Sequence, residues 1–299
     1  MKPFYWIDSF EGYPPEMDEP IRESIVTYDT HYGPYTRALG YDFRLMRLED
    51  LEIAVGQRPM IIHAEFGDLL AQPGGAYVGL IHPDRQKAGK LETLYGLIAD
   101  SCQVKLLNFV PGFPMVCKDK FRGAGIAASV GLNVPRSVLL ESGRLQQSQM
   151  HFVERSLGPY PFFVRPPDLT SGLGKKVLND RTALLKYSGR PPFPGRMLLI
   201  QTCIAVEAEY RVYLDRGKTI ACRLRRPLKA GESCSVPAAV RAGSEALAAH
   251  LGASYLCVDW LWDGEQFWFC EFETGGGFGE LSEADQHRVA AAFFQILGS

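Results

Sequence analysis

Three acidic residues stand inside a stretch that is otherwise apolar and aromatic, YLCVDWLWDGEQFWFCEFE (255–273): Asp259, Glu271 and Glu273. Two strands around the turn signal DGEQ predict a hairpin, and a carboxylate buried there needs a cation because its desolvation is unfavourable. A loop at 264–266 would set Asp259 opposite Glu271 with Glu273 on the same face, whereas a two-residue Asp-Gly turn would separate them unless a bulge restored the register. Converging carboxylates suit Mg²⁺, which prefers oxygen ligands. The alternative, a solvated outer face, leaves the intervening Trp, Phe and Cys unexplained, so we favour a metal site.

A second stretch, PFFVRPPDLTSGLGKK (161–176), has the composition of a phosphate-binding loop. Arg165 ends an apolar strand, and Ser171, Gly172 and Gly174 follow on a segment that can present backbone N–H groups to anionic oxygens. A plain turn with a surface arginine is the common alternative. The position of the arginine between a buried strand and a glycine loop favours phosphate binding.

A third stretch, EYRVYLDRGKTIACRLRRP (209–227), carries several arginines across a predicted strand pair. Each arginine alone is more often a surface residue. Beside a metal and a phosphate loop, Arg211 and Arg225 are predicted to stabilise the charge that develops on a transferred phosphoryl group.

The elements that must position these residues fall into two halves. Alternating strands and helices before residue 111 predict an open α/β sheet, with strands at 4–8, 41–48, 58–64, 76–81 and 104–110 and a helix at 91–102. The connection PGFPMV (111–116) predicts a boundary between domains 1–115 and 116–299. The second half predicts strands at 161–165, 176–178, 197–204, 209–215, 255–262 and 266–273, and helices at 118–131, 180–189, 237–251 and 283–297.

From residue 116 to 280, the order of these segments resembles the ATP-grasp fold, the family of D-alanine–D-alanine ligase, glutathione synthetase and the RimK-type amino-acid ligases. The motifs that carry the resemblance are KDK before a helix and GLNVP, PFFVRPPDLTSGLG, LLIQTCI with AEYRVYLD, and VDWLW with FCEFETGGG. The resemblance implies an α/β ATP-grasp fold with an N-terminal open α/β domain. It also implies a lid-bearing subdomain at 116–200 and a metal and nucleotide subdomain at 201–299.

The resemblance further implies a role for each matching residue. Lys120 would contact the nucleotide phosphates, Gln201 would face the adenine amino group, and Glu209 would hold the ribose hydroxyls. The remaining adenine contacts would come from the backbone of Thr202 and Cys203 and from Ile204. Asp259 and Glu271 would bind Mg²⁺.

Two positions depart from the family pattern. Arg165 stands where most of the family has Lys, as in the clade associated with amide ligation in small-peptide and natural-product pathways. An arginine can still clamp phosphates, and its planar fork does so bidentately. Glu273 stands where the family usually has Asn, so it adds a negative charge that either strengthens Mg²⁺ binding or changes the metal stoichiometry.

The implied activity is an ADP-forming carboxylate–amine ligase that works through an acyl phosphate, with the loop 170–174 closing as a lid. Its substrates would be an amino acid, a small peptide or a natural-product precursor. The run TGGGFG (274–279) either receives the amine acceptor or is a flexible turn. Two alternatives stay open: a small-molecule kinase on the same fold, and a module that binds ATP without turnover.

Composition narrows the class of protein further. The formal net charge is −2, and no basic stripe with interleaved aromatics occurs, so nucleic acid is not the expected main partner, although an aromatic single-strand site stays open. Asp8 and Glu11 interrupt the run that a signal peptide needs, and no membrane-length apolar stretch occurs, so we expect a cytoplasmic enzyme. The seven cysteines include no C-x-x-C pair, which predicts reduced core thiols.

Arg22, His31 and Arg37 could bind a substrate carboxylate, but a solvated surface position is the better prediction for each. The sequence does not specify the oligomeric state, a homodimer included.

Overall fold

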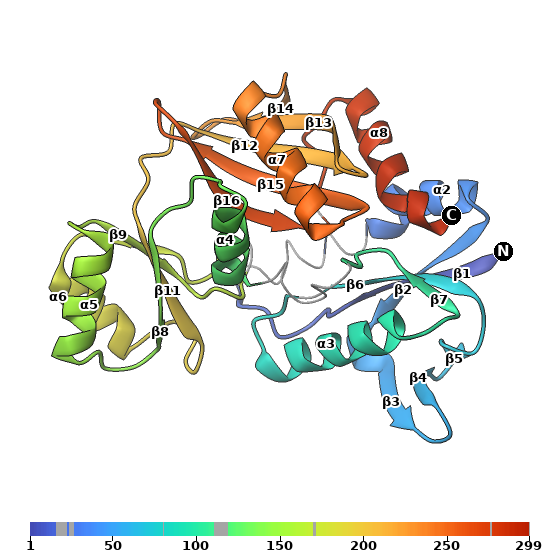
Figure 1. Ribbon diagram of the computed structural model, residues 1–299. Helices are drawn as coiled ribbons and strands as arrows, with labels where there is room; N and C mark the ends of the chain where they lie inside the picture. The colour runs from blue at the N-terminus through green and yellow to red at the C-terminus, as the bar shows by residue number, and fades with distance from the viewer. Residues whose placement is uncertain are drawn as a thin grey trace.

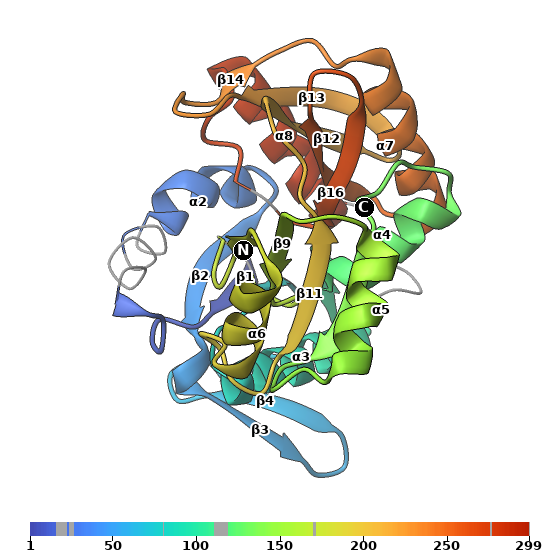
Figure 2. The same cartoon turned by 90° about the vertical axis from the view of Figure 1, so that its left-hand side faces the viewer.

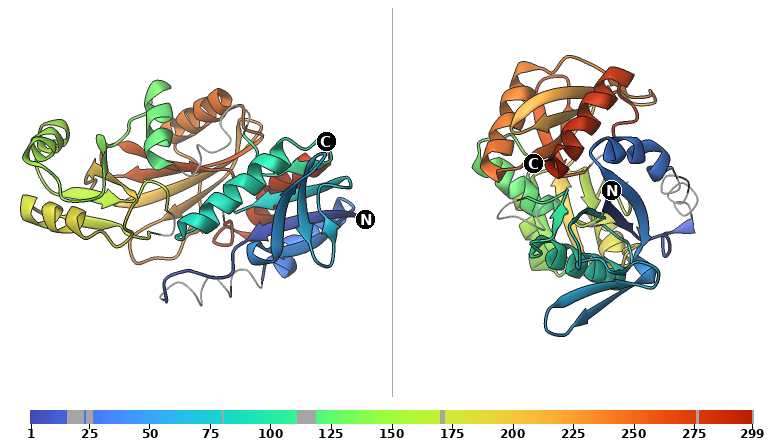
Figure 3. Two further views of the ribbon diagram at one scale, coloured as in Figure 1. Left: turned by 90° about the horizontal axis from the view of Figure 1, so that it is seen from below. Right: turned by 90° about the vertical axis from the view of Figure 1, so that its right-hand side faces the viewer.

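The computed structural model describes residues 1–15, 23, 27–79, 81–110, 119–169, 172–275 and 277–298. Its helices and strands form three regions, coloured blue to cyan, green to yellow, and orange to red along the chain (Figure 1). Both termini lie on the same side of the molecule (Figures 1 and 3). The connection 111–116 lies outside the described residues, and the predicted domain division there stays a prediction.

The N-terminal region is built on a parallel sheet with the strand order β2-β1-β6-β7. Its elements are β1 (Lys2–Asp8), β2 (Tyr41–Arg47), β6 (Gly74–Val78), β7 (Val104–Leu106), α2 (Tyr28–Ala38) and α3 (Arg85–Ala99). Phe4 and Trp6 of β1 pack with α2, whereas Tyr5 and Ile7 pack with α3, because alternate residues of a strand face opposite sides of a sheet. The predicted open α/β sheet is therefore confirmed.

A small antiparallel sheet extends from this region. It contains β3 (Leu51–Val55), β4 (Pro59–His63) and β5 (Gly67–Asp68), preceded by the short 3-10 helix η1 (Leu48–Asp50). The strand predicted at 58–64 pairs here with β3, so it does not join the parallel sheet as the alternation predicted. Only three residues separate β3 from β4, which is enough for a hairpin but too few for a parallel crossover.

The middle region is an antiparallel sheet with the order β10-β9-β11-β8. Its strands are β8 (Ser137–Glu141), β9 (Phe162–Arg165), β10 (Lys176–Leu178) and β11 (Met197–Thr202). Helices α5 (Gln147–Leu157) and α6 (Arg181–Gly189) stand in front of β9 and β11 when the molecule is viewed from this end (Figure 2). Phe162 and Val164 of β9 are fully buried under these helices, so Arg165 at the strand end is held on a rigid element.

The C-terminal region is an antiparallel sheet with the order β14-β13-β12-β15-β16. Its strands are β12 (Ala208–Asp215), β13 (Lys218–Arg225), β14 (Glu232–Ser233), β15 (Tyr255–Trp262) and β16 (Phe267–Glu273). Its helices are α7 (Ala238–Leu251), α8 (Glu283–Phe294) and the short η3 (Gln295–Leu297). Helix α4 (Lys120–Ser129) packs against β16, where a Cβ on Gly123 would lie 3.4 Å from the ring of Phe272.

One apolar cluster joins the first and last regions. Phe293 and Phe294 of α8 pack with Phe4 and Trp6 of β1 and with Tyr32 of α2. A shared core therefore holds the N-terminal and C-terminal regions together.

Candidate functional site

The β15–β16 hairpin brings the three predicted acids together, although by neither turn considered from the sequence. Its connection has four residues, 263–266, because Trp262 pairs with Phe267. A β-bulge then leaves Cys270 without a partner on β15, and Asp259 pairs with Glu271. The predicted three-residue loop is wrong, but the bulge gives the register that the loop was expected to give.

The carboxylates of Asp259, Glu271 and Glu273 converge. One oxygen from each lies within 4.8 Å of the others, which meets the prediction of a shared face. Burial raises the pKa of Glu273 to about 7. The charge of Arg211 acts against this rise, and the charges of Asp259 and Glu271 add to it. Burial also disfavours ionised Glu271, but the neighbouring cations outweigh it and lower the pKa of that carboxyl. An oxygen-rich group of this kind could hold a hard divalent cation.

Two cations approach this group from other elements. Lys120 is the first residue of α4, and the Asp119 side chain caps the N-terminus of this helix. The Lys120 Nζ lies 3.2 Å from Glu271 Oε2 and donates a hydrogen bond to the Leu169 carbonyl. Arg165 Nη1 lies 3.5 Å from the same Glu271 oxygen. The Arg165 Nε is buried and makes no hydrogen bond among the described residues, so it has a donor to spare for an anion.

Arg211 is positioned by the register of β12 against β15, in which it lies directly opposite Asp259. Its Nε and Nη2 donate to the two oxygens of Asp259 at 2.7 and 2.6 Å, and its Nη1 lies 3.6 Å from Glu273. The guanidinium is thus held by a bidentate pair at the acids, and its predicted catalytic role stays a prediction. Arg225 also borders the cleft but is exposed, so its catalytic role stays a prediction.

A cleft of about 650 Å³ separates the middle and C-terminal sheets, and most of the predicted site residues line it. They are Lys120, Arg165, Gly172, Gln201, Thr202, Cys203, Ile204, Glu209, Arg211, Arg225, Asp259, Glu271 and Glu273. Ser171 lies outside the described residues. Gly174 does not line the cleft: its carbonyl accepts the Tyr187 hydroxyl, and a Cβ there would lie 2.9 Å from Pro166 Cδ. Close packing and a φ of +66° explain why residue 174 is a glycine.

Two of the groups at the strand end predicted to contact adenine already make hydrogen bonds within the protein. Gln201 is buried, and its Nε2 donates to the Ser137 hydroxyl at 2.9 Å. The Thr202 N–H donates to the Arg136 carbonyl. Any adenine contact from these two residues therefore uses other atoms, and Glu209 stands exposed at the cleft where a ribose could reach it.

The cleft lining also includes residues that the sequence reasoning missed, and Phe163 and Lys175 are two of them. Phe163 lines the cleft two positions before Arg165, whose guanidinium carbon lies 5.6 Å from the ring centroid. The two-residue period of a strand could have revealed Phe163. Lys175 also lines the cleft, and the run of lysines after the glycines gave a signal for it.

The described cysteines are all free, as predicted, but they are not all core residues. Cys222 and Cys257 are buried, whereas Cys102 is exposed. The surface predictions for two N-terminal cations are consistent with the structure: exposed Arg37 pairs with Asp29, and partly exposed His31 lies against Phe278. Arg22 lies outside the described residues.

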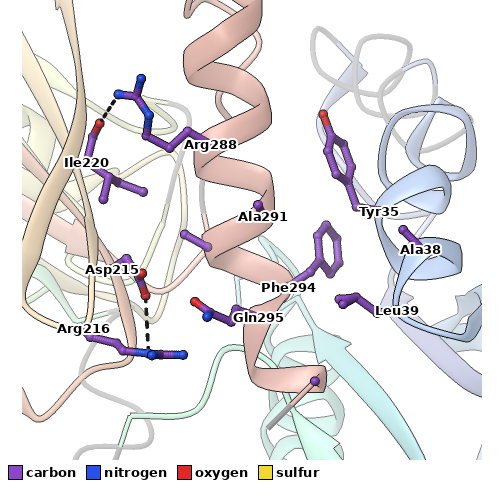
Figure 4. A pocket seen from close by; sticks show the side chains of 12 residues that line it. Tyr35, Ala38, Leu39, Asp215, Arg216, Ile220, Arg288, Ala291, Phe294 and Gln295 are labelled. Carbon is purple, nitrogen blue, oxygen red and sulfur yellow. Dashed lines mark hydrogen bonds and ion pairs between the residues drawn. The ribbon is translucent and has the colours of Figure 1, made fainter.

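A second hollow, of about 560 Å³, lies between α2, α8 and the β12–β13 turn (Figure 4). Tyr35 and Phe294 stack in it, and Arg288 donates to the Ile220 carbonyl. Asp215 is the one acid in its lining, and Arg216 lies beside it. This hollow contains no convergent group of carboxylates among the described residues, so the chemistry is assigned to the cleft.

Solved structures match this chain over nearly its whole length. The D-cycloserine synthetase DcsG is 15% identical with a TM-score of 0.67, over 99% of this chain and 98% of that one. The D-alanine–D-alanine ligase of Bacillus anthracis, solved with ATP, is 16% identical with a TM-score of 0.65, over 99% and 95%. The macrocyclase MdnC of Microcystis aeruginosa, bound with the precursor peptide MdnA, is 11% identical with a TM-score of 0.64, over 99% and 100%. No protein-family model and no curated protein matches the sequence.

None of the helices in the described ranges combines the length and the apolar character that crossing a bilayer requires.

Proposed function

Since the chain has the ATP-grasp fold, as its sequence predicted, we propose that it is an ATP-dependent, ADP-forming carboxylate–amine ligase. The observation that carries the proposal is the cleft in which three carboxylates face Lys120 and Arg165. A carboxylate group for a metal, opposite cations for phosphate, is the arrangement that phosphoryl transfer from ATP requires. The substrates would be an amino acid or peptide carboxylate and a second molecule that supplies an amine, in the cytoplasm.

The donor set fits Mg²⁺. Asp259, Glu271 and Glu273 offer hard oxygen ligands within 4.8 Å of one another, and their present partners are cations that a divalent ion can replace. A divalent ion held by these three carboxylates would supply positive charge against the negative charge that develops on the transferred phosphoryl group. Glu273 in place of the usual Asn gives this group a third negative charge.

The chain's own residues would orient the reactants. Lys120 and Arg165 would hold the nucleotide phosphates while the substrate carboxylate attacks the γ-phosphorus, giving an acyl phosphate and ADP. The amine then attacks the acyl carbon, and the amide forms as phosphate and a proton leave. Arg211, at the edge of the carboxylate group, would stabilise the negative charge of this step together with Arg225.

The nucleotide would lie along the end of β11. Gln201, Thr202, Cys203 and Ile204 would contact the adenine, and Glu209 would bind the ribose hydroxyls. Gly172 has a φ of +74°, which suits a phosphate-facing loop that presents N–H groups, and we propose that loop 170–174 closes over the acyl phosphate to exclude water.

The proposal is tested by screening pairs of amino acids and dipeptides for ADP release with ATP and Mg²⁺, with the product masses read by mass spectrometry. An amide product with stoichiometric ADP is expected. A stable phosphoester would indicate a kinase instead. ATP binding without ADP release across the panel, retained unchanged in Glu271→Gln, would count against a catalytic site.

A further inference from the structure

Arg196 is a buried charged residue that the ligase mechanism leaves unused. It directly precedes β11, is 5% exposed and does not line the cleft. Its Nη1 pairs with the carboxylate of Asp168 in the middle region. Its Nη2 donates hydrogen bonds to the carbonyls of His82 at 3.0 Å and Pro83 at 2.8 Å, in the N-terminal region just before α3. A buried guanidinium needs such partners, and this one has them in two regions of the molecule.

Asp168 lies in the short segment 166–169, which follows Arg165 at the end of β9 and precedes the glycine loop. The other three residues of this segment are buried. The Asp168 Oδ1 is also buried and makes no hydrogen bond among the described residues. Within the described ranges, the cation of this carboxylate is therefore Arg196, and removal of either partner would leave the other uncompensated.

The same segment holds the lysine that is proposed to bind the nucleotide phosphates. The Lys120 N–H donates to the Pro167 carbonyl at 3.0 Å, and the Lys120 Nζ donates to the Leu169 carbonyl at 2.7 Å. These two carbonyls belong to the residues on either side of Asp168. Arg196 and Lys120 thus bind neighbouring residues of one segment, so the position of Lys120 depends on how firmly Arg196 holds that segment.

A second arginine joins the same two regions without holding the segment. Arg85, the first residue of α3, donates from Nη1 to the Gly195 carbonyl at 2.7 Å. Gly195 directly precedes Arg196, but Arg85 is exposed and makes no hydrogen bond or ion pair with residues 166–169 within the described ranges. The chain therefore offers two arginines at one junction that differ in whether they hold the segment that contacts Lys120.

We propose, building on the ligase function, that Arg196 is a positioning residue for the phosphate-binding cations. Two backbone carbonyls of the N-terminal region fix its guanidinium, and through Asp168 it fixes segment 166–169 and with it Lys120. An arginine suits this role because its planar fork presents separate donors to partners on different segments, whereas a lysine offers a single nitrogen. Without Arg196 the segment would hold Lys120 correctly for only part of the time, and ATP would bind more weakly by the inverse of that fraction.

The positioning is measured without any ligand by amide hydrogen exchange of the full chain. The Lys120 N–H is a suitable reporter, because its partner is the Pro167 carbonyl while the Asp119 side chain caps the two N–H groups that follow. Arg196→Met and Asp168→Asn should each speed the exchange of this amide by about tenfold or more. Arg85→Met, the matched control, should exchange like the wild type. If Arg196 acts through Asp168, the double variant should exchange no faster than Arg196→Met alone.

Nucleotide binding gives the second readout. Calorimetric titration with ATP and Mg²⁺, without a carboxylate substrate, should show a Kd that is about tenfold higher in Arg196→Met and unchanged in Arg85→Met. In turnover the KM for ATP should rise by the same factor while kcat stays near that of the wild type, because the molecules that have bound ATP have Lys120 in place.

Unchanged exchange at Lys120 in both Arg196→Met and Asp168→Asn would overturn the inference, as would an equal effect of Arg85→Met. An increase of the same size in the amides between β12 and β15 would also overturn it, because Arg196 would then only support the overall fold. If Arg196→Met does not fold, Asp168→Asn decides alone, since the Asp168 side chain is 37% exposed. Failure of the ligase proposal looks different: the exchange of Lys120 responds as expected, but no amino acid causes ADP release.

Discussion

Asp8, the last residue of β1, should destabilise the folded chain when it is ionised, and the pH dependence of unfolding measures this effect. Burial raises the pKa of Asp8 from 3.8 to about 7; the Ser9 N–H opposes the rise and the Glu49 carboxylate adds to it. The folded state therefore holds the proton more tightly than the unfolded state. The free energy of unfolding must then decrease as the pH rises from about 4 to about 7, and it stays lower above that range.

Asp8→Asn removes this dependence, because asparagine stays neutral. The two pKa values differ by about three units, which sets an upper bound of about 4 kcal/mol above pH 7. Water reaches part of the side chain, so the measured value should be smaller. The same pKa values give about 2–3 kcal/mol for the change between pH 5 and pH 8.

Urea unfolding of both proteins at pH 5 and pH 8 is the assay. The stability of Asp8→Asn relative to the wild type should increase between these pH values. That of Asp42→Asn, which alters a half-exposed acid paired with Arg44, should change little and serves as the control. A stability difference that stays constant or falls with pH would mean that a cation already compensates Asp8 in the free protein. That result would refute the reasoning, since ionised Asp8 would then not lack a partner.

Three further predictions concern the charged pairs. Glu271→Gln should lower ADP release by about one-hundredfold or more while the circular dichroism spectrum is retained, because the metal group loses a charged ligand. Arg211→Met should lower the free energy of unfolding by about 3–5 kcal/mol in urea titrations, because it leaves Asp259 without its cation; an unchanged midpoint would contradict the pairing. Burial opposes ionised Glu49, but hydrogen bonds from Lys87 and a serine lower its pKa to about 2. Its stabilisation is therefore complete above pH 4.5 and is lost as the pH falls toward 2, so the decrease in Tm caused by Lys87→Met should be larger at pH 7 than at pH 3.

The sequence predicted those site residues whose role is indicated by their neighbours in the same strand. Asp259 and Glu271 stood out because acids among Trp and Phe need a cation, and Arg165 because it ends a buried strand before glycines. The bulge at Cys270 could not be predicted in the same way. Its position depends on how β16 packs against α4 and β15, which no local pattern encodes.

Asp8 shows where sequence reasoning stopped. In the sequence it was a charge that ended an apolar run, and nothing there related it to the segment after β16, more than 260 positions later. The relation comes from the shared core of β1 and α8, which brings the carboxyl end of β1 next to the segment that follows β16. Contacts between domains of this kind follow from tertiary packing, so the N-terminal half could be assigned a fold but not a role.

The charged side chains of the cleft can exchange their ion-pair partners when ligands bind, and each would then still have a partner of opposite charge. In the free protein, Glu271 pairs with Lys120 and Arg165, and Asp259 pairs with Arg211. Mg²⁺ and nucleotide phosphates together would give each carboxylate a cation and each cation an anion, so both states satisfy their partly buried charges. A site balanced in this way can bind Mg²⁺ and ATP with little rearrangement.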